Sequence, residues 1–352
     1  MKKIIKILYI IIFILVLSGC NGQKNMEEDY DISIISTDKI SLFKQYNGSI
    51  TLQKEIKRND NFGFLKEDYF NLKDKIFIKT TVIGKKALLA KINKNTLNID
   101  LKKDDSEPYT FTYYENKIYA TTVFTDKFNI IEYDDNFKEI KKKEIKKEGV
   151  NITNNIQVYK DNIFILGGNI DKNSKIRNLI WKFDMNFNLL EEIDLNYGQG
   201  AYLRFYIKDD IIYISQNSHG LTANNEPKGS NNILKYNIDN KSKEFITLKY
   251  SYPLNIYPDQ DNLIIEHYSL YVSNYRWTIL NTKNNVQKNI YFNDRPKNED
   301  KPPFFNQDKI NYYFLFYDKL YVYNKETLEE TIYNLSDYNI SNADILITKK
   351  GD

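Results

Sequence analysis

Residues 110–134 read TFTYYENKIYATTVFTDKFNIIEYD and contain the unit that recurs along the whole chain. The stretch has three short segments rich in β-branched and aromatic residues, which are typical of strands. Between them lie Asn116-Lys117 and Thr125-Asp126-Lys127. Asp and Asn suit tight turns because their side chains bond the nearby backbone and tolerate left-handed geometry. The pattern therefore predicts three successive strands joined by two tight turns.

An Asp or Asn, one polar residue and then an apolar strand recur six times, with a weaker seventh copy at Ala343-Asp344-Ile345. Each of the first six copies follows a short apolar or aromatic segment, so each predicts a strand, a turn and a second strand. The spacing between successive copies runs from 35 to 52 residues. The apolar residue that marks each copy is Ile76, Ile118, Ile163, Ile211, Leu263, Ile310 or Ile345.

A second unit is an alternating strand that ends in an aromatic or aliphatic residue and is followed by Asp or Asn. Another alternating segment comes after it, so this unit also predicts two strands. The two series alternate along the chain without exception, so each complete repeat holds four strands. The apolar residues that mark the second series are Tyr46, Ile92, Tyr133, Phe183, Tyr236, Leu280 and Tyr323.

A four-stranded repeat of this length resembles a blade of a β-propeller, an all-β ring of radially arranged sheets. The half-repeat near Tyr46 opens the domain and the half-repeat near Ile345 closes it. Together they make a seventh blade from both termini, which removes an exposed sheet edge. We therefore expect seven blades over residues 31–352. A six-bladed ring with the end segments packed outside is the alternative.

The N-terminus reads MKKIIKILYIIIFILVLSGC, with a basic start followed by an unbroken apolar run over residues 7–17. This is the pattern of an export signal, and the run is too short for a comfortable transmembrane helix. Leu17-Ser18-Gly19-Cys20 resembles the lipobox of bacterial lipoproteins. The resemblance implies that residues 1–19 are a signal peptide and that Cys20 carries the lipid. Residues 21–30 are polar and poor in apolar side chains, so residues 20–30 are expected to be the lipidated Cys and a short tether to the domain.

The net charge of the chain comes entirely from this signal. There are 50 Lys and Arg against 47 Asp and Glu, a formal charge of +3. Lys2, Lys3 and Lys6 lie in residues 1–19, so the processed chain holds 50 − 3 = 47 basic residues against 47 acidic ones. A neutral chain gives no argument for nucleic-acid binding. The single Cys excludes an internal disulfide.

In a propeller, the loops between strands two and three and those between consecutive blades emerge on the same face. The longest loops of this kind are predicted over residues 216–231 and 294–303. Insertions on one face of a repeat protein often form its binding face, so we expect a ligand site at blades 3–5. Neutral drift in surface loops is the alternative. The candidate ligand-binding residues are Arg204, His219, His267, Tyr271, Tyr275 and Arg276.

These candidates suggest recognition of an anion, a sugar or a peptide. Arg204 lies on a predicted innermost strand, where it would face the channel as an anion anchor or form a structural ion pair. Tyr271, Tyr275 and Arg276 belong to an aromatic-rich segment that would stack on a sugar or peptide if exposed. Trp277 of this segment shares its strand type with Trp181, and both are expected to be buried core between blades.

The two histidines do not form a metal site by spacing. His219 and His267 have no third ligand at a metal-binding interval. Glu266 and His267 are neighbours in an alternating strand, so their side chains point to opposite faces. No GxSxG, P-loop, CxxC or HExxH motif occurs, so we expect no cofactor and no metal.

The sequence thus favours a lipid-anchored binding or scaffold module on the outer face of the bacterial cytoplasmic membrane. Its expected partners are the membrane, through the lipid on Cys20, and an envelope protein, peptide or glycan. The alternative is an extracytoplasmic hydrolase or lyase that uses Arg204, His219, Glu266 and His267. A solute receptor for a transporter would need two lobes and α/β alternation, and the repeats oppose both.

Overall fold

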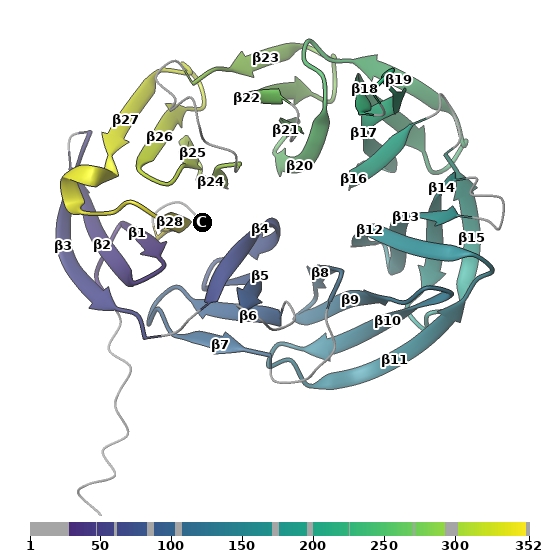
Figure 1. The fold of residues 1–352 in the computed structure, drawn as a ribbon, viewed down its shortest axis with the longest axis horizontal. Coiled ribbons are helices and arrows are strands. Elements are labelled where there is room, and N and C mark those ends of the chain that lie inside the picture. Colours follow the sequence, from purple (N-terminus) through teal and green to yellow (C-terminus); the bar gives the residue numbers. More distant parts are fainter. Residues whose placement is uncertain are drawn as a thin grey trace, which may run out of the picture.

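Seven four-stranded antiparallel sheets form a closed ring in the computed structural model (Figure 1). The structure describes residues 28–46, 48–59, 62–82, 88–102, 108–170, 176–195, 200–224, 226–269, 272–292 and 302–349. Each sheet radiates from the centre of the ring as one blade. The predicted seven-bladed β-propeller is therefore confirmed, and the six-bladed alternative is excluded.

Six blades are continuous in the chain, each running from its innermost to its outermost strand. Blade 1 consists of β4 (Phe62–Asn71), β5 (Lys75–Val82), β6 (Leu88–Asn93) and β7 (Ile99–Leu101). Blade 2 consists of β8 (Thr110–Tyr114), β9 (Lys117–Val123), β10 (Lys127–Asp134) and β11 (Glu139–Lys146). Blade 3 consists of β12 (Val150–Tyr159), β13 (Asn162–Ile170), β14 (Ile176–Asp184) and β15 (Leu189–Asp194).

The remaining three continuous blades follow the same order. Blade 4 consists of β16 (Ala201–Lys208), β17 (Ile211–Leu221), β18 (Pro227–Asn237) and β19 (Lys243–Thr247). Blade 5 consists of β20 (Pro253–Asp259), β21 (Asn262–Ser269), β22 (Val272–Asn281) and β23 (Gln287–Ile290). Blade 6 consists of β24 (Phe304–Gln307), β25 (Asn311–Leu315), β26 (Lys319–Asn324) and β27 (Glu330–Asn334), and a 3₁₀ turn, η1 (Leu335–Tyr338), follows it.

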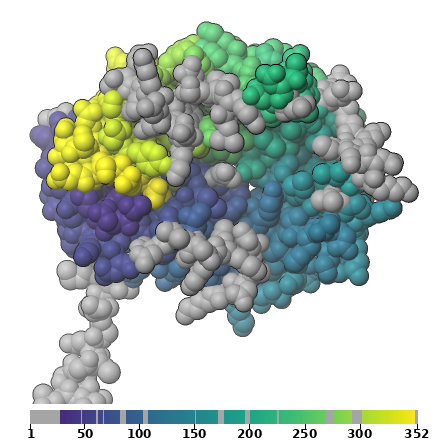
Figure 2. Space-filling model, in the orientation of Figure 1, coloured from purple at the N-terminus to yellow at the C-terminus, as the bar shows by residue number. Residues whose placement is uncertain are grey.

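Blade 7 closes the ring with strands from both ends of the chain. Its order is β28 (Ala343–Thr348), β1 (Ile32–Ser36), β2 (Lys39–Tyr46) and β3 (Ser49–Lys57), and Ile345 pairs with Ile35. Figure 2 shows the purple N-terminal and yellow C-terminal parts of the chain side by side. The C-terminus therefore contributes one strand and the N-terminus three.

The prediction that each terminus contributes two strands to blade 7 is thus wrong. Ala343-Asp344-Ile345 does not form the predicted turn but lies inside β28. Ile345, Leu346 and Ile347 are all fully buried, so this strand has the continuous apolar run of a strand that is covered on both faces. Such a run carries no periodicity that would reveal where a hairpin begins.

The turns explain why Asp and Asn recur in both series. In the copies of the first series in blades 2, 3 and 4, both central turn residues have positive φ, which matches the twist of a hairpin. These pairs are Glu115 and Asn116, Lys160 and Asp161, and Asp209 and Asp210. In the second series the side-chain oxygen of the Asp or Asn accepts backbone N–H groups from the next few residues. This contact occurs at Asn93, Asp134, Asp184, Asn237, Asn281 and Asn324.

Apolar side chains fill the space between neighbouring blades. Trp181 and Trp277 are fully buried, as the inter-blade interpretation predicts. The Lys-rich segment of residues 138–147, whose alternation predicts an outer strand, forms the outermost strand β11 with alternating exposure. Tyr46 and Ile310, two of the apolar residues that mark the sequence repeat, are exposed and do not belong to this core. No helix in the described part of the chain is long and apolar enough to cross a membrane.

Candidate functional site

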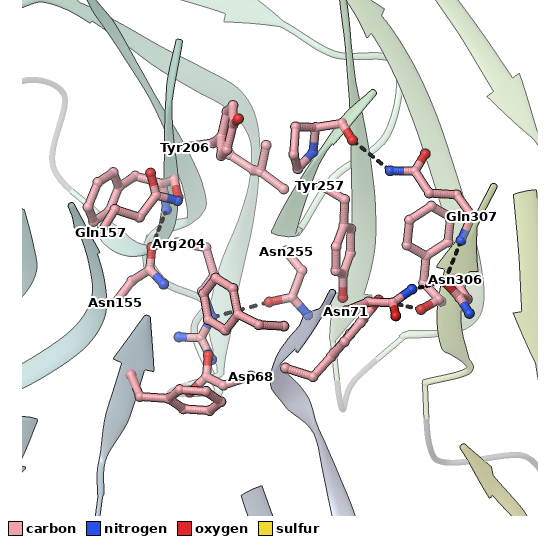
Figure 3. Close-up of a pocket in the computed structure, with 17 residues that line it drawn as sticks. Asp68, Asn71, Asn155, Gln157, Arg204, Tyr206, Asn255, Tyr257, Asn306 and Gln307 are labelled. Carbon is pink, nitrogen blue, oxygen red and sulfur yellow. Dashed lines mark hydrogen bonds and ion pairs between the residues drawn. The ribbon is translucent and has the colours of Figure 1, made fainter. Parts of the chain in front are cut away.

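The innermost strands of blades 1 to 6 enclose a cavity of about 390 Å³ at the centre of the ring. Its lining comes from β4, β8, β12, β16, β20 and β24. Figure 3 shows Asn155, Gln157 and Arg204 on the left of the view, Asn306 and Gln307 on the right, and Asn255 between Arg204 and Tyr257. A cavity of this size, with aromatic walls and convergent polar groups, is typical of a ligand site.

Bulges in four innermost strands supply the residues at the centre of this cavity. The pairing of β4 with β5 is interrupted between Leu65 and Tyr69. The innermost strands of blades 3, 4 and 5, which are β12, β16 and β20, have similar interruptions in their pairing with the second strand of the blade. A bulge inserts residues that are not paired, and so turns a side chain in a new direction. The residues inside these four irregular segments include Asp68, Asn154, Arg204 and Asn255.

Arg204 joins four of the innermost strands. Its Nε donates to Oδ1 of Asn255 at 3.2 Å, and its Nη1 donates to the carbonyl oxygens of Asn154 at 2.6 Å and Leu203 at 3.1 Å. Its Nη2 lies 3.6 Å from Oδ1 of Asp68. The guanidinium group therefore holds β12, β16, β20 and β4 together, and most of its donors are already used.

The charges around the cavity are balanced. Asp68 also lies 3.6 Å from Nζ of Lys79, which donates to the carbonyl oxygen of Tyr109 at 2.8 Å. Glu266 accepts a hydrogen bond of 2.6 Å from Nδ2 of Asn255. Arg204 and Lys79 thus lie beside Asp68, and Asn255 links Arg204 to Glu266. Two cations and two carboxylates leave no net charge from this set, which favours an uncharged polar ligand over an ion.

Two partly buried tyrosines form an aromatic wall of the cavity. The rings of Tyr69 and Tyr257 lie 5.9 Å apart, and Tyr257 is stacked on the Trp277 ring at 5.8 Å. Burial, and the carboxylate of Glu266, raise the pKa of Tyr69 well above its usual value. Burial first, and then Tyr69 and Glu266, raise the pKa of Tyr257. Both hydroxyls therefore stay protonated, and that of Tyr69 donates to the carbonyl oxygen of Phe305.

Several amides of the cavity hold the innermost strands rather than facing a ligand. Gln157 donates to the carbonyl oxygen of Phe205 at 2.8 Å and accepts from the N–H of Ile207 at 3.0 Å, while Asn155 accepts from the N–H of Phe205 at 3.2 Å. These side chains satisfy the open backbone edge of β16, which would otherwise lack partners.

Asn71 is a cavity amide whose side-chain oxygen has no hydrogen-bond donor among the described residues. Its Nδ2 donates to Oδ1 of Asn306 at 2.6 Å. Its own Oδ1 is buried and accepts no hydrogen bond within the described part of the protein. A buried oxygen without a donor is costly, so this atom is a candidate acceptor for a ligand N–H or O–H group.

The structure brings only part of the predicted site together. Arg204 lines the cavity, and Glu266 reaches it through Asn255. His267 is buried elsewhere, with Nδ1 at 3.0 Å from the carbonyl oxygen of Ser251 and Nε2 at 2.9 Å from Oγ1 of Thr278. His219 is exposed near the end of β17 and does not line the cavity. The four residues of the enzyme alternative therefore do not gather in one described pocket.

Arg276 belongs to a different cluster, where its guanidinium lies 4.7 Å from the ring centre of Tyr250. Tyr271, the side chain of Tyr275, Cys20 and most of 294–303 lie outside the described residues. The predicted loop 216–231 is instead largely the extended end of the β17–β18 hairpin, in which Leu221 pairs with Pro227. Polar strands of this kind lack the apolar alternation that marks a strand in the sequence.

Sequence reasoning missed Asp68, Asn255, Tyr69 and Tyr257. The available signal was a carboxylate inside the aromatic strand of residues 62–71, since a charge in such a strand needs a partner. In the described residues, no group of three His, Cys, Asp or Glu side chains could hold a metal ion.

Comparison with known proteins identifies the fold and nothing finer. No family model and no curated protein sequence matches the chain. Apo AztD from Citrobacter koseri is similar in structure, with a TM-score of 0.52 and 10% identity over 91% of this chain and 98% of that one. KlHsv2 with loop 6CD replaced by a Gly-Ser linker has a TM-score of 0.50 and 10% identity, over 91% and 95%. The chain is therefore a seven-bladed β-propeller with distant structural relatives.

Proposed function

We propose that this protein is a binding module, anchored by lipid to the outer face of the bacterial cytoplasmic membrane, that takes a neutral polar group of an envelope protein, peptide or glycan into its central cavity. The anchor is supported by Leu17-Ser18-Gly19-Cys20 and the export signal before it. The binding role is supported by a closed ring with a central cavity.

The observation that carries the binding proposal is the charge balance at the cavity. Asp68 and Glu266 are each engaged by a neighbouring cation or amide, and Arg204 has used most of its donors. The groups left for a ligand are then the aromatic wall and Oδ1 of Asn71, which is buried and accepts no hydrogen bond within the described residues. Amide N–H groups and sugar hydroxyls can donate to that acceptor, and aromatic rings pack on the apolar faces of both ligand types.

Calorimetric titration with two probes tests this proposal. One probe is a disaccharide of N-acetylated amino sugars and the other is a short neutral peptide. We expect one of them to bind the wild-type chain and to lose about tenfold in affinity in Asn71→Leu, because one buried hydrogen bond is removed. Asn98→Leu is the matched control, since Asn98 is exposed and far from the cavity lining. Absence of saturable binding by both probes, or equal losses in both variants, would overturn the proposal.

A further inference from the structure

A second group of polar side chains lies outside the central cavity, where blades 5 and 6 meet the connections that lead into them. Lys249 and Tyr250 lie between β19 and β20, Arg276 lies in β22, and Tyr291 follows β23. The four residues therefore come from three separate segments of the chain, and tertiary contacts alone bring them together.

The hydroxyl oxygen of Tyr291 is the centre of this group. It accepts a hydrogen bond from the hydroxyl of Tyr250 and another from Nζ of Lys249 at 3.1 Å. The guanidinium of Arg276 lies 4.7 Å from the ring centre of Tyr250 and 5.8 Å from that of Tyr291. Lys249 lies 5.5 Å and 5.8 Å from the same two ring centres. Two cations thus converge on two phenols.

Neither cation has a carboxylate partner within the described ranges of the chain. The ion pairs of those ranges involve neither Lys249 nor Arg276. Glu330, which shares a small cavity with Tyr291, is engaged by the hydroxyl of Tyr323. His267, whose ring packs against Tyr250 at 5.8 Å, adds no charge near neutral pH because burial lowers its pKa to about 4. The cluster is therefore a local excess of two positive charges.

The cluster already stabilises negative charge on an oxygen. The hydrogen bonds from Tyr250 and Lys249, together with the charges of Lys249 and Arg276, lower the pKa of Tyr291 from its ordinary value. Tyr291 and Lys249 are exposed, so an external oxyanion can reach the same donors. The hydroxyl of Tyr291 would then donate a hydrogen bond to the anion and keep its proton, because the bound negative charge disfavours the phenolate.

We propose that Lys249, Arg276, Tyr250 and Tyr291 form a binding site for a phosphate group. Two cations match the charge of a phosphate better than the single charge of a carboxylate, and the phenol hydroxyls supply additional donors to its several oxygens. The phosphate belongs either to a free phosphate compound or to a lipid headgroup, and both offer the same chemistry. The site is separate from the central cavity, so it does not depend on the function proposed for that cavity.

Calorimetric titration of the purified chain with inorganic phosphate, and sedimentation with vesicles of phosphatidylglycerol or of phosphatidylcholine, test the proposal. We expect saturable binding of phosphate, or preferential binding of phosphatidylglycerol vesicles, and the arm that responds identifies the source of the phosphate. Lys249→Met and Arg276→Met are each expected to weaken binding about tenfold through the loss of one charge-assisted contact. Lys57→Met, at an exposed Lys on β3, is the matched control.

Ultraviolet titration of the tyrosines gives a second readout. Added phosphate should raise the pKa of one phenol in the wild type, and this change should be absent in Tyr291→Phe, which keeps the ring. Circular dichroism establishes that each variant is folded. The proposal is wrong if neither phosphate nor phosphatidylglycerol binds, if acetate binds as well as phosphate, or if Lys57→Met weakens binding as much as Lys249→Met.

Discussion

Arg204 and Asp68 meet across the central channel, with Nη2 of Arg204 at 3.6 Å from Oδ1 of Asp68. Their strands, β16 and β4, belong to blades 4 and 1, which do not neighbour each other in the ring. Both side chains are largely buried, at 16% and 7% exposure. A buried ion pair of this kind adds little to the free energy of unfolding, because desolvation of the two charges offsets their attraction. Removal of one partner is costly, because the other charge stays buried without a counterion.

Loss of Asp68 should therefore cost more stability than loss of Arg204. Asp68→Asn leaves two buried cations, Arg204 and Lys79, without their carboxylate, and we expect a loss of about 3 kcal/mol. Arg204→Met leaves Asp68 still beside Lys79, so we expect about 2 kcal/mol, including the lost hydrogen bonds. Urea unfolding of both variants measures the difference. Equal effects, or a greater loss in Arg204→Met, would show that Lys79 does not compensate Asp68.

His267 should make the stability of the propeller depend on pH between about 6.5 and 4. Burial lowers its pKa from 6.5 to about 4, so the unfolded chain binds a proton in this range and the folded chain does not. The stabilisation is complete above pH 6.5 and falls as the pH drops towards 4, by about 3 kcal/mol in total. Urea unfolding at both pH values should show a smaller fall in His267→Gln than in the wild type. The interpretation fails if the two proteins lose the same amount.

Ile345 and Ile310 mark equivalent points of the sequence repeat but should respond differently to truncation. Ile345 is fully buried in β28, the C-terminal strand that closes the ring, whereas Ile310 is 63% exposed. We expect Ile345→Ala to cost about 3 kcal/mol, since it leaves a cavity in the closing blade. Ile310→Ala should stay within about 0.5 kcal/mol of the wild type. Thermal and urea unfolding compare the pair, and similar losses would contradict the placement of β28.

Cys20 should carry the lipid that anchors the chain. Mass spectrometry of the processed N-terminus is expected to find Cys20 with more than one acyl chain, because a single chain holds a protein at a membrane only marginally. Cys20→Ala should release the protein into the medium without changing the propeller, whose described residues begin at 28. An unmodified Cys20 in a processed chain would refute the lipobox interpretation.

The repeat could be predicted from the sequence because its determinants are local. Asp134 and Asn237 each bond backbone N–H groups only a few residues away, so the turn and its sequence signal lie in the same short segment. The alternation of β11 likewise reports one exposed and one covered face. The seven blades follow from counting such segments. The innermost position of β28 does not, because a strand buried on both faces has no alternation to read.

The candidate site could be predicted only at Arg204. Asp68 and Asn255 reach the cavity because their strands bulge, and a bulge depends on how one strand pairs with the next rather than on the residues within it. Tyr291 likewise gains its two donors from a connection more than 40 positions earlier in the chain.

The sequence by itself determined the number of blades and the turns between their strands, since both depend on residues close together in the chain. Only the tertiary structure decided which side chains face one another across the channel and which cations lack a carboxylate partner among the described residues. Closure of the ring brings distant segments within hydrogen-bonding distance, and short-range patterns carry no information about that closure.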